Sequence, residues 1–173
     1  MKPNEIRDIS LAPSGRQKID WVRANMPLLN GLEEDFRKSR PFEGVKISLS
    51  VHLEAKTAYL CEVLAAGGAD MSVTGSNVLS TQDDVAAALA AAGMKVYAYH
   101  GATAEEYERH IEMTLEHSPN IIIDDGGDLV NMLHTKRPDL MKDLWGGCEE
   151  TTTGIIRLKA MEKDGVLKCP WWR

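Results

Sequence analysis

Carboxylates and hydroxyls that could do chemistry gather between residues 121 and 154. Residues 121–125 are three isoleucines followed by two aspartates, which is typical of a buried strand with carboxylates at its end. A second carboxylate pair, Glu149 and Glu150, comes directly before Thr151 to Thr153. Because open α/β sheets bind ligands at the carboxyl ends of their strands, this stretch predicts a polar ligand site.

Two further strand-to-helix junctions carry polar groups, residues 48–57 and 75–83. All three junctions would lie at one edge of a parallel sheet and could line a single crevice. His52 in the first junction suits acid/base catalysis because histidine titrates near neutrality, although a histidine beside a helix start can also be merely hydrogen-bonded. A buried aspartate at a strand end is more often a cap or a loop anchor than a catalyst, so the crevice depends on all three junctions together.

Each of these groups has a second interpretation. His52, Asp124 and Asp125 could bind a metal ion, but nothing in their spacing requires one, and we expect no metal. Glu149, Glu150 and the threonines could simply begin a helix, where acids and a hydroxyl cap are stabilising. Three consecutive threonines exceed what a cap needs, and hydroxyls with free amides at a helix start suit a sugar or a phosphate.

Strand-like and helix-like segments alternate along most of the chain, which predicts βαβ units. The fold class we expect is α/β: a Rossmann-like, doubly wound parallel sheet with helices on both faces and two extra N-terminal helices. Thr103 and Glu106 predict a capping box, whereas Ser14, and Ser80 or Thr81, are candidate N-caps. The expected strands span residues 45–50, 69–75, 95–100 and 120–124, and the expected helices span 14–26, 27–40, 52–68, 80–94, 103–117, 128–134 and 151–163.

Composition excludes several classes of protein. The net charge of -6 disfavours general binding to nucleic acid. No apolar run approaches the roughly 20 residues that a membrane helix needs, and the first ten residues contain no apolar signal core, so we expect a cytoplasmic protein. The three cysteines are odd in number and share no close metal spacing, which argues against a disulfide framework.

Several motifs of the chain resemble the S-adenosyl-L-homocysteine hydrolase (adenosylhomocysteinase) family. The motifs are SLSVHLEAKTA, NVLSTQD, DDGGDL, HTKRP and EETTTG, in the family's order, within a resemblance that runs from about Ile6 to Lys168. The resemblance implies an NAD-dependent cycle on S-adenosyl-L-homocysteine. The 3'-hydroxyl of the nucleoside is oxidised, the acidified C4' proton is removed, homocysteine is eliminated, water adds, and the ketone is reduced back. The products are a nucleoside and homocysteine.

The resemblance also implies roles for individual residues. His52 and Asp125 would serve acid/base steps near C4' and C5', and Glu150 would hold ribose hydroxyls. Thr151, Thr152 and Thr153 would contact the nicotinamide end of NAD. The remaining implied residues are Thr57 and Gln82 in the nucleoside pocket, and Asp124 and Asp128 as loop anchors. The implied partners are a small nucleoside thioether and, in a full-length protein, further copies of the chain.

Two positions depart from the family pattern. Glu54 and Lys56 stand where much of the family has Thr and Glu. The family's glutamate accepts a hydrogen bond from the adenine amino group, whereas an ammonium can only donate. A donor suits the O6 carbonyl of hypoxanthine, so we hypothesise that S-inosyl-L-homocysteine is a preferred or accepted substrate. The alternative is that both side chains only pair with other groups of the protein.

The end of the chain is the second departure. The family continues into an NAD-binding domain with a GxGxxG loop, and that loop is absent from this sequence, so we expect residues 1–173 to be a substrate-binding domain alone. One deleted base would turn the family's Val-Pro continuation into Cys-Pro-Trp-Trp-Arg and a stop codon, which suggests a frameshifted, truncated hydrolase that is inactive alone. The alternatives are a stand-alone nucleoside- or thioether-binding domain and an acidic metal-dependent hydrolase.

Overall fold

The computed structural model describes residues 4–172 and contains a six-stranded sheet in the order β3-β2-β1-β4-β5-β6. Every neighbouring pair of strands is parallel. The strand order reverses between β1 and β4, and such a reversal opens a crevice at the carboxyl ends of the two strands. The strands are β1 (Lys46–Val51), β2 (Asp70–Gly75), β3 (Lys95–Val96), β4 (Ile121–Asp124), β5 (Gly146–Glu149) and β6 (Trp171–Trp172).

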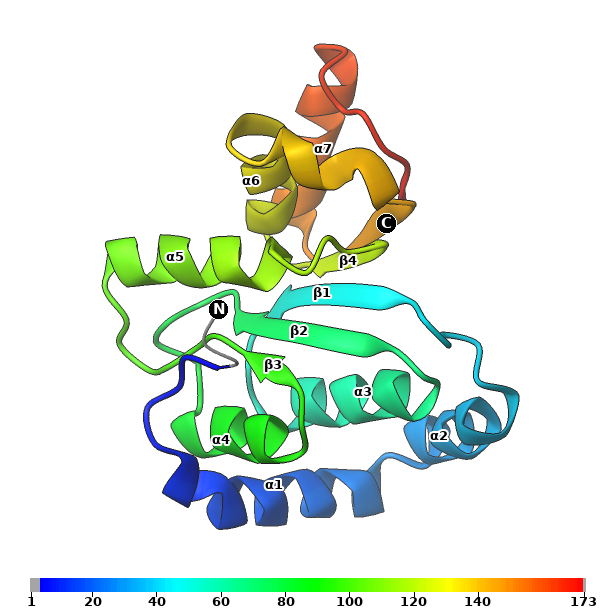
Figure 1. The fold of residues 1–173 in the computed structure, drawn as a ribbon, viewed down its shortest axis with the longest axis vertical. Helices are drawn as coiled ribbons and strands as arrows, with labels where there is room; N and C mark the ends of the chain where they lie inside the picture. The colour runs from blue at the N-terminus through cyan, green and yellow to red at the C-terminus, as the bar shows by residue number, and fades with distance from the viewer. Residues whose placement is uncertain (1–3, 173) are drawn as a thin grey trace.

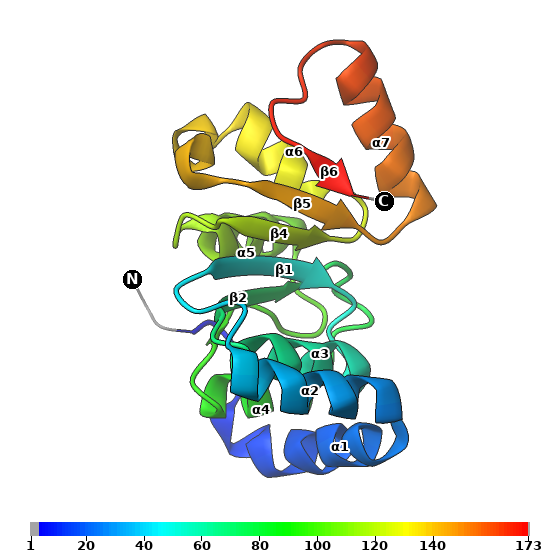
Figure 2. The same cartoon turned by 90° about the vertical axis from the view of Figure 1, so that its right-hand side faces the viewer.

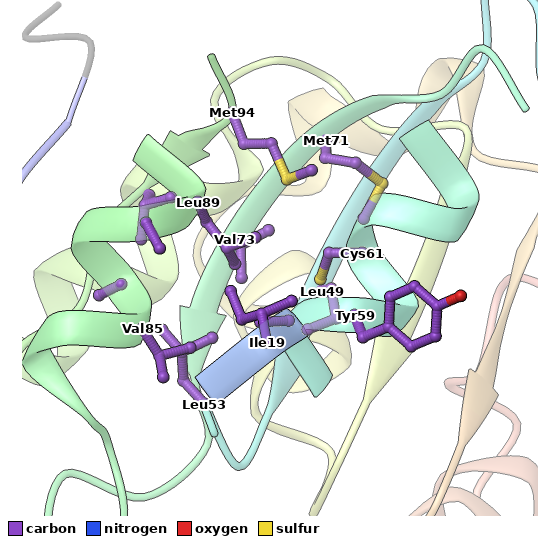
Figure 3. Packing of buried hydrophobic residues seen from close by; sticks show 14 of the residues in the cluster. Ile19, Leu49, Leu53, Tyr59, Cys61, Met71, Val73, Val85, Leu89 and Met94 are labelled. Carbon is purple, nitrogen blue, oxygen red and sulfur yellow. The ribbon is translucent and has the colours of Figure 1, made fainter. Parts of the chain in front are cut away.

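One face of the sheet is covered by α3 (Ala55–Ala66) and α4 (Asp83–Ala91), with α1 (Ala12–Asn25) and α2 (Pro27–Ser39) outside them (Figure 1). Their shared core is apolar and buried, and Figure 3 shows Ile19, Leu49, Val73 and Leu89 within it. A side chain at Gly15 would overlap the backbone carbonyl of Asp84, so glycine lets α1 approach α4 closely. The two extra N-terminal helices are therefore a second layer on the sheet-covering helices.

The opposite face carries a smaller core. Ile122 lies in register with Ser48 and so points away from the Leu49 side of the sheet. Around Ile122 pack α5 (Ala104–Leu115) and α6 (Asp128–Thr135), which lie across β1 from α3 (Figures 1 and 2). The rest of this side is a 3-10 segment, η2 (Pro138–Asp143), and α7 (Thr152–Lys163), which leads from β5 to β6. Helices on both faces confirm the predicted doubly wound fold.

Some local predictions are confirmed and others are wrong. Thr103 and Glu106 form the predicted capping box of α5. Ser14 is not an N-cap, because it lies inside α1 and donates to Asp84 Oδ2 at 2.8 Å. Ser80 and Thr81 do not cap α4 either, since Gln82 holds the N-cap position.

The predicted strand 95–100 is regular only at its first two residues. Beyond them, Tyr97 N still donates to Val73 O of β2, while Ala98 N donates to Glu5 O of the N-terminal segment. The strands β5 and β6 were not predicted. Residues 1–3 and Arg173, the last residue of the proposed frameshifted tail, lie outside the described residues. Within residues 4–172, no helix combines the length and apolar composition needed to cross a bilayer.

Candidate functional site

His52 and Asp125 face each other across the point where the strand order reverses. His52 directly follows β1 and Asp125 directly follows β4, and Figure 2 shows both strands ending at the same edge of the sheet. His52 Nε2 lies 3.6 Å from Asp125 Oδ2. Two serines hold the pair, since Ser80 Oγ lies 2.5 Å from His52 Nδ1 and Ser76 Oγ donates to Asp125 Oδ2 at 2.6 Å. The three predicted junctions therefore do meet at one edge.

The side chains of His52 and Asp125 differ in their exposure to solvent. The side chain of Asp125 is 7% exposed, whereas that of His52 is 54% exposed. The carboxylate is fixed by the protein, and the imidazole is open to a ligand while it keeps a hydroxyl and a carboxylate beside it. An imidazole in contact with a buried carboxylate can take up and return a proton during a reaction.

Asp124 anchors the loop that presents Asp125. Its side chain is fully buried and accepts hydrogen bonds from Asp125 N at 3.1 Å and Val130 N at 3.0 Å. Burial raises the pKa of Asp124 to about 7, and the nearby Glu149 carboxylate adds to the rise. Gly126 and Gly127 follow with φ of 104° and 82°, a conformation that side chains rarely adopt.

Asp128 closes the same loop from α6. Its Oδ2 accepts the Tyr107 hydroxyl at 2.8 Å, and its Oδ1 accepts from Arg157 Nη1 at 3.1 Å. Burial first, and then the Asp128 charge, raise the pKa of Tyr107 above its usual range, so the phenol stays a donor. Tyr107 and Arg157 were not predicted, because an aromatic and a cation within helices give no local signal. Ser76 lies in the predicted junction 75–83, but its contact with Asp125 is a tertiary feature.

The threonine run begins α7. Thr151 is the N-cap, with its Oγ1 accepting from Gly154 N at 3.0 Å and donating to Glu149 Oε1 at 2.8 Å. Its hydroxyl is thus used inside the protein, whereas Thr152 and Thr153 are exposed in the first turn. Glu150 is exposed just beyond β5, and its N–H donates to Asp124 O at 3.0 Å.

The predicted base-binding residues lie at a separate hollow of about 570 Å³. Glu54, Lys56 and Gln82 line it, together with the 68%-exposed Trp21 of α1. Glu54 caps α3, because its Oε1 accepts from Lys56 N at 3.0 Å and from Thr57 N at 3.3 Å. Thr57 itself is buried and does not line the hollow.

Lys56 and Gln82 differ in what they can offer a ligand at this hollow. In the part of the chain that the structure describes, the Lys56 ammonium has no hydrogen-bond or ion-pair partner. Gln82 Oε1 accepts from Lys18 Nζ at 2.9 Å, which leaves its amide nitrogen to donate elsewhere. Among residues 4–172, no group of three or more histidine, cysteine, aspartate or glutamate side chains is placed to hold a metal ion.

A doubly wound sheet with an imidazole–carboxylate pair at its switch point defines an α/β protein with a Rossmann-like ligand site. Residues 3–142 match the family described as S-adenosyl-L-homocysteine hydrolase. The chain belongs to this family.

Curated relatives carry two different names. The S-inosyl-L-homocysteine hydrolase of Methanocaldococcus jannaschii is 57% identical over 166 residues, which cover 96% of this chain and 40% of that protein. The adenosylhomocysteinase of Thermococcus kodakarensis is 55% identical over 165 residues, covering 95% and 39% respectively. The S-inosyl-L-homocysteine hydrolase of Methanococcus maripaludis is 53% identical, with coverage of 96% and 40%. The chain thus spans about 40% of the length of these relatives.

Proposed function

We propose that this chain forms the nucleoside-binding part of a hydrolase that reversibly cleaves S-adenosyl- or S-inosyl-L-homocysteine into nucleoside and homocysteine. The observation that carries the proposal is the His52–Asp125 pair, 3.6 Å apart at the sheet's switch point, in a chain of this family. Elimination of a thiol needs one group that removes the C4' proton and one group that donates a proton to the departing sulfur. The pair supplies both groups side by side, each held by its own serine hydroxyl.

The chain's own residues divide the work of binding and proton transfer. Asp125, held by Ser76, would take the C4' proton, and His52 would hold or return a proton near C5'. Glu150, exposed beyond β5, would accept hydrogen bonds from ribose hydroxyls. In the described part of the chain, no atom beyond the adjoining residues lies within 4 Å of the place where a side chain on Gly126 would sit, so the sugar could approach the backbone there.

NAD is the cofactor we propose, and it would supply hydride transfer at the ribose 3' carbon. The exposed hydroxyls of Thr152 and Thr153, in the first turn of a 12-residue helix with free amides, fit the nicotinamide end. Thr151 would act indirectly, because its hydroxyl already bonds Glu149 and Gly154. These residues fit one edge of the cofactor.

Inosine is the nucleoside that the hollow favours. The free Lys56 ammonium and the Gln82 amide nitrogen are both donors, and Trp21 offers an indole face for a planar base. Hypoxanthine presents an O6 acceptor to such donors, whereas the adenine amino group would leave donors unpaired. Two of the relatives above are named S-inosyl-L-homocysteine hydrolases, which supports this preference.

A chimera tests the proposed activity. In it, this chain would replace the matching segment of the Methanocaldococcus jannaschii relative, and thiol release would be measured with both substrates and NAD. We expect turnover that Asp125→Asn lowers by about 10²-fold or more, the usual contribution of a general base. The matched control is Asp143→Asn, an exposed carboxylate on η2. Turnover that survives Asp125→Asn would contradict the proposal.

A stand-alone binding domain is the second candidate function. The exposed His52 and the open hollow beside Lys56 could bind a nucleoside without catalysis. Calorimetry with inosine and adenosine, with and without NAD, separates the two functions. Inosine binding that NAD does not change, together with an inactive chimera, would favour the binding domain.

Three properties of the protein in the cell belong to the same proposal. We propose a cytoplasmic protein that does not bind nucleic acid and that assembles with further copies of itself at full length. The net charge of -6 supports the second property. Cell fractionation, filter binding with DNA and RNA, and light scattering of a full-length form test the three in turn.

A further inference from the structure

Glu149 ends β5 in a row of buried polar residues. Thr74, Ser50, Asp124 and Glu149 are successive register partners across β2, β1, β4 and β5, so their side chains point to one face. All four lie under the carboxyl edge, and each is at most 6% exposed. Glu149 is the member of the row nearest to α7.

One oxygen of Glu149 joins two segments that are distant in the sequence. Its Oε1 accepts from Gly126 N at 2.8 Å, in the loop that presents Asp125. The same oxygen accepts from Thr151 N at 2.9 Å and from the Thr151 hydroxyl at 2.8 Å, at the start of α7. Within residues 4–172, Oε2 is buried without a hydrogen-bond partner, so Oε1 carries all the contacts of this carboxylate.

Gly154 packs directly against this carboxylate. A Cβ built on Gly154 would overlap the carboxylate carbon and both oxygens of Glu149, which are its three nearest atoms. Gly154 is in the helical region and buried, so its lack of a side chain is explained by this contact. Residues 149–154 thus form the start of α7 and also leave a space at Gly154 that the Glu149 carboxylate fills.

We propose that Glu149 is a positioning residue that locks the Asp125 loop to the N-terminus of α7, so that the two halves of the site keep one geometry. The roles of the two halves rest on the proposed function, but the lock itself does not. Arg157 of α7 also reaches this loop, since its Nη1 donates to Gly126 O at 2.8 Å, but it is Glu149 that holds the Gly126 amide.

The charge of Glu149 also acts on Asp124, the neighbouring carboxyl in the row. Burial raises the pKa of Asp124, and the charges of Glu149 and Asp128 add to the rise, so Asp124 is partly protonated near neutrality. The charged groups that bear on Asp124 thus come from β5 and α6. Glu149→Gln should therefore lower the pKa of Asp124, while its amide oxygen keeps the position of Oε1.

A double-mutant cycle on the 173-residue chain tests the lock without any ligand. Glu149→Ala should speed hydrogen exchange of the Gly126 and Thr151 amides together, and Gly154→Ala should do the same by displacing the carboxylate. Gly154→Ala should destabilise the wild-type chain. In the Glu149→Ala background it should be neutral or stabilising, because the clash is gone and Ala is the better helix former. The matched control is Glu150→Gln, the exposed neighbouring carboxylate, which should leave both amides unchanged.

Steady-state kinetics of the chimera then distinguish a positioning role of Glu149 from a purely stabilising one. Glu149→Ala should lower kcat by about 10²-fold, the cost of a catalytic group misplaced by about 1 Å, with little change in KM. Glu149→Gln should restore most of kcat. An equal destabilising effect of Gly154→Ala in both backgrounds, or protection lost at only one of the two amides, would overturn the lock. An inactive wild-type chimera with an intact cycle would instead contradict the proposed function and leave the lock standing.

Discussion

Asp124→Asn should change how the stability of the chain depends on pH. Asp124 is fully buried, and its pKa is raised from 3.8 to about 7, first by burial and then by the charge of Glu149. The folded chain therefore holds a proton that the unfolded chain releases at lower pH. The stability contributed by this group is present below pH 3.8 and is lost as the pH rises through about 7.

The size of the effect follows from the two pKa values. At about 1.4 kcal/mol per unit, the raised pKa destabilises the folded chain by roughly 4 kcal/mol above pH 8 and by about 2 kcal/mol at pH 5. Asparagine does not ionise. It loses one of the two hydrogen bonds to Asp125 N and Val130 N, a cost of about 1–3 kcal/mol that does not depend on pH. The wild-type advantage over Asp124→Asn should thus shrink by about 2 kcal/mol or more between pH 5 and pH 8.

Urea unfolding of both proteins at pH 5, 6, 7 and 8 measures this difference. Taking the difference cancels the contributions of groups that titrate alike in the two proteins. Asp143→Asn, an exposed carboxylate, is the control and should show a difference that does not vary with pH. A wild-type advantage over Asp124→Asn that stays constant from pH 5 to pH 8 would refute the assignment of the raised pKa to Asp124.

Three further predictions concern other parts of the chain. Burial lowers the pKa of His117 from 6.5 to about 4, so stability should fall by about 3 kcal/mol as the pH drops from 6.5 to 4, and His117→Gln should remove most of that slope in urea titrations. Thr103→Ala breaks the capping box of α5 and should cost about 1 kcal/mol by thermal unfolding, whereas Thr135→Ala at the end of α6 should cost less. Lys56→Glu should shift calorimetric preference from inosine toward adenosine by about 10- to 100-fold, with Lys142→Glu as an inert control; an unchanged ratio would remove Lys56 from the base site.

Much of the fold could be predicted from the sequence because its signals are local. Apolar runs such as 121–123, the glycines after α3, and the Thr103–Glu106 box each mark an element boundary on their own. The strand β5 was not predicted because Gly146, Gly147 and Glu149 have low strand propensity. This segment is a strand because β4 and β6 offer it parallel partners on its two sides. The two-residue β6 likewise depends on its pairing with β5.

The candidate site, too, could be predicted only in part from the sequence. His52 and Asp125 were predicted because each sits at the end of a recognisable strand, and the sheet then brings them to 3.6 Å. The contacts that hold them could not be predicted. Ser76 reaches Asp125 across 49 positions, and Glu149 reaches Gly126 across 23, so both depend on the strand order. Glu54 combines both kinds of signal, since it caps α3 locally and also lines the hollow where the family resemblance places the base.

Mapping where a nucleoside binds on this chain tests the proposed site at His52 and Asp125 most directly. Amide chemical shifts of the 173-residue protein would be followed as inosine is added, with His52→Asn as a comparison. We expect perturbations that cluster at His52, Asp125 and Glu150 and extend to Lys56, and that weaken in the variant. Perturbations confined to other surfaces, or none at saturating inosine, would contradict the proposed site.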